Sequence, residues 1–172
     1  MNVHKLVLLG VLTASAIVIG ILESFIPSIG IPGVKLGLTN IVILVTLFEL
    51  GVFEASIISM LRVVIVAVTR GTLFSMGFLM SLSGAILSLG IMIILFYTIK
   101  KFSIIGISVI GALFHVIGQI LVAMLYLGTT YILYYLPIIA ISAIITGVIV
   151  GLISQAIIRT GVIKKQRQKY DF

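Results

Sequence analysis

The chain consists of long apolar runs, one after another, and this feature limits its possible folds more than any other. A membrane-spanning helix needs roughly 20 mostly apolar residues, and six runs approach or reach that length: residues 6–26, 36–50, 52–68, 73–99, 104–127 and 131–158. Only 9% of the 172 residues are charged, too few to give a soluble domain its surface. We therefore expect an all-α integral membrane protein, a bundle of six transmembrane helices forming one domain over residues 1–172, with a polar tail at 160–172.

The distribution of lysine and arginine predicts how the bundle is oriented. With six spans both termini lie on one side of the membrane, which then holds most basic residues: Lys5, Lys100, Lys101, Arg159, Lys164, Lys165, Arg167 and Lys169. Because the cytoplasmic side carries the excess of such residues, we expect a cell-membrane protein with both termini in the cytoplasm. A five-span arrangement, with residues 36–68 as one re-entrant unit, separates the basic residues less cleanly. The net charge of +7 then reflects orientation and contact with membrane lipids rather than nucleic-acid binding.

Polar residues within or beside the apolar runs are the candidates for a binding site. A charge at mid-bilayer costs roughly 2.5–3.5 kcal/mol on insertion scales, and Arg62 lies inside the third run. His115 and Gln119 are one turn apart, on one face of the fifth helix. Further polar side chains lie in the predicted outer part of the first four helices: Glu23, Lys35, Asn40, Arg70 and Ser81. Together they suggest a site for a small polar ligand, possibly anionic, that enters from outside.

Each of these residues also has a simpler interpretation. Arg62 could snorkel to the interface or pair with a helix-end carbonyl. His115 and Gln119 could form only an interhelical hydrogen bond that fixes packing. Lys35, in the stretch PGVKLGLTN, follows a bend at Pro32 and Gly33. A lysine near a helix N-terminus opposes the helix dipole, so we expect an anion beside it, although Lys35 could simply extend to lipid phosphates.

Several kinds of chemistry are excluded by composition. The chain has no cysteine, which rules out disulfides, thiolate metal sites and cysteine nucleophiles. Its only aspartate is Asp171, and no carboxylate pair has the spacing needed for Mg²⁺ and diphosphate. No glycine-rich phosphate loop with a lysine is present. We therefore expect a protein that is not an enzyme and carries no cofactor or metal ion.

Small residues four positions apart predict faces on which helices approach closely. Two such pairs lie on the first helix, Gly10 with Ala14 and Ala16 with Gly20. A third set lies on the sixth helix, at residues 143, 147 and 151. Spacing of this kind does not distinguish packing inside the bundle from contact with a partner subunit.

Several short motifs resemble the Gx transporter family, whose members are often labelled heptaprenyl diphosphate synthase component I. They are PGVKLGLTNIV after a first helix ending in ES, LR in the third helix and HVIGQ in the fifth. The resemblance covers nearly the whole chain. That family is similar to the S components of energy-coupling factor (ECF) transporters, which are six-helix proteins with both ends in the cytoplasm.

The resemblance implies a fold like that of an ECF S component, which binds a vitamin-like substrate from outside. It also implies partners, a transmembrane T subunit and two ATPase subunits. In S components an Ala-x-x-x-Ala motif on the first helix contacts the T subunit. Gly10 and Ala14 match that motif here, with glycine in place of the first alanine.

Two functions stay open at this point. The first is the substrate-binding subunit of an ECF-type importer that takes up a small, possibly anionic, vitamin- or precursor-like molecule. The second is a non-catalytic membrane partner of a soluble polyprenyl diphosphate synthase, since prenyl synthases use two aspartate-rich motifs that this chain lacks. A water-accessible outer pocket would favour the first, and a lipid-facing apolar path the second. An independent proton or ion carrier would need a longer relay than His115 and Glu23.

Overall fold

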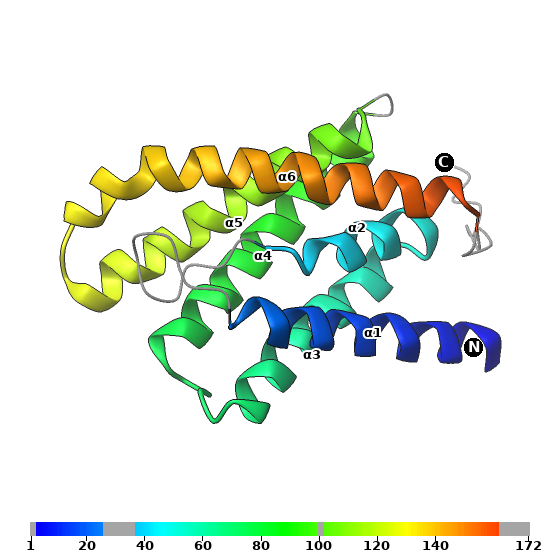
Figure 1. Cartoon of the computed structure of the whole chain (residues 1–172), viewed down its shortest axis with the longest axis horizontal. Coiled ribbons are helices and arrows are strands. Elements are labelled where there is room, and N and C mark those ends of the chain that lie inside the picture. The colour runs from blue at the N-terminus through cyan, green and yellow to red at the C-terminus, as the bar shows by residue number, and fades with distance from the viewer. Residues whose placement is uncertain (1–2, 26–36, 100–101, 162–172) are drawn as a thin grey trace.

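The computed structural model describes residues 3–25, 37–99 and 102–161, and these residues are almost entirely helical (Figure 1). They form six α-helices and one short 3-10 helix: α1 Val3–Glu23, α2 Asn40–Glu49, α3 Val52–Thr69, α4 Met76–Thr98, α5 Ile104–Leu127, η1 Tyr131–Tyr135 and α6 Leu136–Arg159. By length and composition, five helical segments are able to cross a membrane. The chain is therefore an all-α, multi-pass membrane protein, as the apolar runs predict.

Helix α2 differs most from expectation, because it has ten residues where the sequence predicts a helix over 36–50. Ten residues rise about 15 Å, half of the roughly 30 Å hydrocarbon core. The helix follows a turn at Gly37, where φ is +80°, and is separated from α3 by Gly51, where φ is +119°. Both values suit glycine better than any residue with a side chain. The structure therefore has five helical segments of spanning length and one half-length helix.

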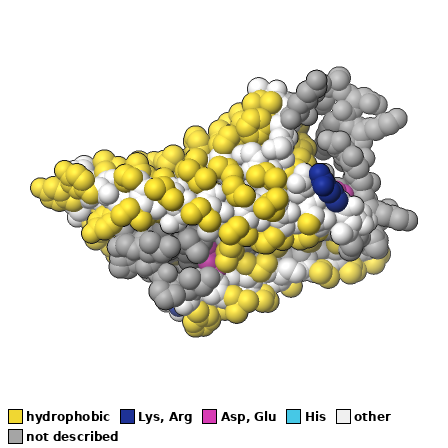
Figure 2. All heavy atoms as spheres, turned by 45° about the horizontal axis from the view of Figure 1, so that its top comes forward, with side chains coloured by type: hydrophobic (Ala, Val, Ile, Leu, Met, Phe, Trp, Pro, Cys, Tyr) yellow, Lys and Arg dark blue, Asp and Glu magenta, His cyan; other side chains and the backbone are white. Residues whose placement is uncertain are grey.

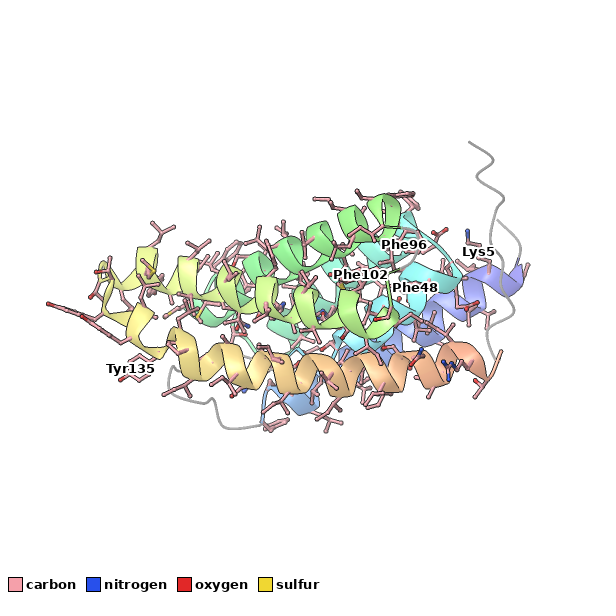
Figure 3. The ribbon with its side chains drawn as sticks, turned by 90° about the horizontal axis from the view of Figure 1, so that it is seen from above. Lys5, Phe48, Phe96, Phe102 and Tyr135 are labelled. Carbon is pink, nitrogen blue, oxygen red and sulfur yellow. The ribbon has the colours of Figure 1, made fainter. Side chains whose placement is uncertain are left out.

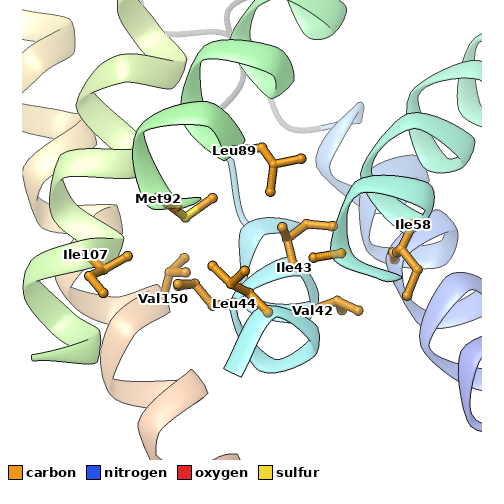
Figure 4. Close-up of a cluster of buried hydrophobic side chains, with 11 residues drawn as sticks. Val42, Ile43, Leu44, Ile58, Leu89, Met92, Ile107 and Val150 are labelled. Carbon is orange, nitrogen blue, oxygen red and sulfur yellow. The ribbon is translucent and has the colours of Figure 1, made fainter. Parts of the chain in front are cut away.

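The short α2 helix lies in the centre of the bundle. It contacts α1, α3, α5 and α6, and eight of its residues are buried. Figure 4 shows Val42, Ile43 and Leu44 of α2 among apolar side chains of α3, α4, α5 and α6. Because α2 is surrounded in this way, its first residues are held against several helices at once.

Small residues bring α4, α5 and α6 close together. A Cβ added at Gly118 of α5 would lie 2.7 Å from the carbonyl oxygen of Ser83 in α4. One added at Gly147 of α6 would lie 2.8 Å from the Cα of Val109 in α5, and one at Gly151 2.7 Å from the Cα of Ile105. The small-residue set on the sixth helix is therefore used for packing inside the bundle.

The outer surface is apolar and suits contact with lipid. Exposed side chains along α1, α3, α5 and α6 include many of Val, Leu and Ile, and Figure 2 shows one face covered mostly by hydrophobic side chains. Exposed Tyr131 and Tyr134 stack beside the turn between α5 and α6. Tyrosine is enriched at membrane–water interfaces, so this turn is suited to one membrane surface.

The opposite end of the bundle holds the start of α1 and the end of α6 (Figure 1). Lys5 lies at that end, and Tyr135 at the other (Figure 3). Lys5 forms an ion pair with Glu54 in the first turn of α3. The two ends of the described chain therefore share one side of the bundle, as an even number of crossings requires.

Candidate functional site

The end of α1 is joined to the start of α2 through the carboxylate of Glu23. Glu23 is buried and accepts hydrogen bonds from the backbone N–H groups of Gly37 and Leu38, the latter at 3.2 Å. It also accepts one from the hydroxyl of Thr39 at 3.1 Å. Gly37 and Leu38 precede α2, so these N–H groups belong to the turn before the helix, and negative charge is stabilised near a helix N-terminus. Glu23 therefore holds the turn that leads into α2.

The turn before α2 packs against α4 and α5. A Cβ at Gly37 would lie 3.2 Å from Nδ2 of Asn40 and 3.8 Å from Cδ2 of His115. The Asn40 amide donates to the hydroxyl of Ser88 in α4, with the two atoms 3.4 Å apart. The glycine is needed both for its positive φ and for this close approach. As a result, polar side chains of α2, α4 and α5 meet at the start of α2.

His115 and Gln119 lie on the same face of α5, as their spacing predicts. Nε2 of Gln119 is 3.1 Å from Nε2 of His115, and the imidazole lies against α4, 3.0 Å from where a Cβ of Gly84 would be. Gln119 is completely buried. Its carbonyl oxygen has no hydrogen-bond partner among the described residues, so one strong acceptor in the interior is unused.

Arg62 is buried in α3, with only 6% of the residue exposed. Its Nε and Nη2 atoms have no hydrogen-bond partner in the described part of the chain. The negative charge of Glu23 attracts Arg62, but the two side chains do not form an ion pair. Among the described residues the one ion pair is that of Lys5 with Glu54. A guanidinium that snorkels to the interface would be exposed, so burial does not support that interpretation.

Three other predicted site residues are placed differently. Ser81 is buried, but its hydroxyl donates to the carbonyl of Gly77 in its own helix at 2.7 Å. Arg70 is exposed at the end of α3, where it donates to the carbonyl of Ser24 at 3.4 Å and lies over the ring of Phe25. The structure therefore does not bring Arg70 to the start of α2. Lys35 lies outside the described residues.

The buried polar side chains on the helices around the start of α2 are called the polar cluster below. They come from five helices and the turn before α2, and they are Glu23, Thr39, Asn40, Arg62, Ser88, His115 and Gln119. Sequence reasoning missed Thr39 and Ser88. Ser88 is four residues after Gly84, so helical spacing places it on the face that meets His115. Thr39 is within the GLTN motif, directly before Asn40.

The polar cluster is suited to binding rather than to metal chemistry. The described residues contain no group of three or more His, Cys, Asp or Glu side chains that could hold a metal ion. Arg62 is the only buried lysine or arginine among them, and the Glu23 carboxylate is already bound to the start of α2. The remaining capacity is a cation and an amide oxygen, which suits an anion with a hydrogen-bond donor.

A separate apolar groove lies between α4 and α5. It measures about 460 Å³ and is lined by Leu79, Leu82, Ser83, Ile86, Val122, Leu125 and Tyr126. Ile86, Leu125 and Tyr126 are exposed, so the groove opens on the outer surface that lipid covers. It is an apolar, lipid-facing path, unlike the polar cluster inside the bundle.

The two predicted docking residues lie on an open face of α1. Gly10 and Ala14 are both exposed, and a Cβ at Gly10 would meet no atom within 4 Å. The other small pair of this helix, Ala16 and Gly20, is buried. A Cβ at Gly20 would lie 3.1 Å from Val66 of α3. Helix α1 therefore packs inward through one small pair and leaves the other free to meet another helix.

Comparison with known proteins supports the family resemblance. The sequence model of the family described as heptaprenyl diphosphate synthase component I matches residues 12–157. The match includes every residue of the polar cluster and Ala14, while Gly10 precedes it. No curated protein and no solved structure matches the chain.

Proposed function

The chain belongs to the heptaprenyl diphosphate synthase component I family, and we propose that it is the substrate-binding membrane subunit of an ECF-type importer. The observation that carries this proposal is the polar cluster, in which side chains from five helices are buried around the start of a half-length helix. Its substrate is a small polar molecule that enters from the side of the α5–α6 turn.

Physical arguments support a binding role for the cluster. Ionisable residues within membrane segments are costly and are usually found where they bind a substrate or line a pathway. In many transporters the substrate lies at the N-terminus of a broken or half-length helix, because that end attracts polar and anionic groups. Here α2 is such a helix, and Figure 1 shows that it starts short of the α5–α6 turn along the long axis.

The proposal requires partners, since the chain has no glycine-rich phosphate loop with which to use ATP. We propose a T subunit seated on the Gly10 and Ala14 face of α1, and ATPase subunits bound to it in the cytoplasm. Both termini are then cytoplasmic, on the side of Lys5 and Arg159. The chain itself is not an enzyme and needs no cofactor in this role.

The test is recovery of the complex from native membranes. Affinity purification of the tagged full chain should yield a T subunit and ATPase subunits, and the complex in liposomes should bind and hydrolyse ATP. Gly10→Leu and Ala14→Leu should abolish recovery of the T subunit, whereas Leu22→Ala, an exposed change twelve residues after Gly10 on α1, should not. A chain recovered without these subunits, or equal recovery with all three variants, would contradict the proposal.

A second function is favoured by the apolar groove between α4 and α5 and by the family description. In that alternative the chain is a non-catalytic membrane partner of a soluble polyprenyl diphosphate synthase, and the groove takes the growing apolar product. The same purification distinguishes the two functions. Recovery of a soluble synthase whose activity rises on adding the chain would support the alternative.

A further inference from the structure

Two buried nitrogen atoms of the Arg62 side chain indicate what kind of ligand the interior could bind. Nε and Nη2 are both buried and unpartnered among the described residues. In a guanidinium group these two atoms share one edge, and their N–H bonds point the same way. That edge forms paired, parallel hydrogen bonds with two oxygen atoms of a carboxylate or phosphate. The structure therefore leaves open the side of Arg62 that recognises a planar pair of oxygens.

The surroundings of Val66 place the Arg62 face of α3 near the start of α2. Val66 is one turn along the same face of α3, and it lies 3.1 Å from where a Cβ of Gly20 would be. The Thr39 hydroxyl is 3.8 Å from the same point. The Arg62 face of α3 is thus directed toward α1 and the beginning of α2. A ligand bound by Arg62 would thus lie toward the turn that Glu23 holds.

We infer that the polar cluster binds a small monocarboxylic acid, whose carboxylate is held by the Nε–Nη2 edge of Arg62. This inference rests on the proposed substrate-binding function and names the class of substrate. Arg62 is the only buried lysine or arginine in the described ranges, and the Glu23 carboxylate is held by the N–H groups and the hydroxyl of the turn before α2. One guanidinium edge is therefore open to one ligand carboxylate.

Charge balance separates this class from phosphate esters. A phosphate monoester carries about −1.5 to −2 charges at neutral pH. One guanidinium cannot balance it, and uncompensated charge in a buried site is strongly unfavourable. A neutral ligand would leave Arg62 unpaired. A monoanion with two equivalent oxygens pairs with Arg62 and does not bring a second negative charge into the site.

Gln119 adds a second requirement. Its carbonyl oxygen is buried and unpartnered among the described residues, while its Nε2 is held at His115. His115 in turn lies beside Gly37, whose backbone N–H is bound to Glu23. Gln119 is therefore connected to this turn from α5, and the Arg62 face of α3 is directed toward the same turn. The acid should carry an N–H or O–H group that donates to Gln119.

Matched ligands test the inference directly. The probes are benzoate, 4-hydroxybenzoate and 4-aminobenzoate, together with the primary amide of each acid and phenyl phosphate. Each is added to the purified full chain, fused to a fluorescent protein, and the protein that survives heating is measured by size-exclusion chromatography. The carboxylates should raise the midpoint temperature, most with the hydroxyl or amino group, whereas amides and phenyl phosphate should not. Equal effects of acid and amide, or no effect of any carboxylate, would overturn the inference.

Variants of Arg62 separate charge from shape. Arg62→Lys keeps the positive charge but loses the paired edge, and Arg62→Met loses both. We expect both variants to be monodisperse and to bind 4-hydroxybenzoate about 10- to 100-fold more weakly than wild type. Arg159→Lys, an exposed position at the end of α6, should bind like wild type. Unchanged affinity in Arg62→Lys would show that the paired edge is not used.

A second measurement does not depend on the choice of probe. Small molecules extracted from the purified chain and from Arg62→Met are compared by mass spectrometry. A carboxylic acid enriched on the wild-type protein alone supports the inference, whereas enrichment of only phosphate esters or neutral compounds refutes it. If an acid binds but no T subunit is recovered, the importer proposal fails and this inference stands. If the complex forms around a different class of ligand, the inference fails and the importer proposal stands.

Discussion

Replacing Glu23 by alanine tests whether its carboxylate holds the start of α2. The change removes the acceptor of three hydrogen bonds, two from backbone N–H groups and one from the Thr39 hydroxyl. Leaving a buried donor unsatisfied costs about 1–3 kcal/mol, so three donors amount to about 3–9 kcal/mol. Typical domains are stable by about 5–15 kcal/mol. Glu23→Ala should therefore remove a large part of the free energy of unfolding.

Glu23→Gln is the matched variant. One carboxylate oxygen accepts from both Gly37 and Leu38, and glutamine keeps an oxygen for that position. Its amide nitrogen then replaces the oxygen at Thr39, whose hydroxyl can accept as well as donate. Only the extra strength of a charged acceptor is lost, about 1 kcal/mol. Glutamine should thus be much less destabilising than alanine.

The chain has no tryptophan, so tryptophan fluorescence cannot report its unfolding. The loss of helix can instead be followed by far-UV circular dichroism during heating or denaturation with SDS. Leu22→Ala is the control, since Leu22 is the neighbouring residue of α1 and is 61% exposed. From most to least stable, we expect the order wild type, Leu22→Ala, Glu23→Gln and Glu23→Ala. Glu23→Ala as stable as Leu22→Ala would refute the role of Glu23 in holding the turn before α2. Equal destabilisation by glutamine and alanine would show that charge, rather than the acceptor, is what matters.

Three further experiments test the packing of α4 against α5, the orientation in the membrane and the role of Lys35. Gly118→Ala should lower the unfolding midpoint, because its Cβ would lie 2.7 Å from an α4 carbonyl oxygen, whereas Gly90→Ala has open space and should not; similar midpoints would argue against the α4–α5 contact. The chain has no cysteine, so a single introduced cysteine can be labelled by itself. Thr72→Cys should react with an impermeant maleimide from outside, and Thr160→Cys only after the membrane is opened. The reverse pattern would invert the orientation. Lys35→Ala should weaken uptake about 10- to 100-fold if Lys35 faces the substrate, and wild-type uptake would indicate that it only snorkels.

The class of fold was predictable because hydropathy reports directly on burial in lipid. Five runs became helical segments long enough to cross a membrane, with boundaries close to those expected. The length of α2 was not predictable in the same way. Its limits depend on positive φ values at Gly37 and Gly51 and on a carboxylate fourteen residues earlier. An apolar run does not show where a turn supported by a distant side chain begins.

The candidate site was predictable in part, for a related reason. His115 and Gln119 are four residues apart, so helix geometry alone places them together. Asn40 and Ser88 are far apart in the sequence, and their contact depends on how α2 and α4 are rotated. Rotation is poorly encoded in helices that are apolar on nearly every side. Arg70, an expected member of the site, lies at the end of α3, where its side chain contacts Ser24 and Phe25.

Helix α1 is one continuous helix that carries residues for two different roles. Gly10 and Ala14 face outward near its middle, and Glu23 holds the turn before α2 at its end. Glu23 is the thirteenth residue after Gly10, a rise of about 20 Å. A displacement of the α2 turn that carries the end of α1 with it therefore also moves the surface around Gly10. A neighbouring subunit seated there would sense, as a mechanical signal, whether that distant turn has moved.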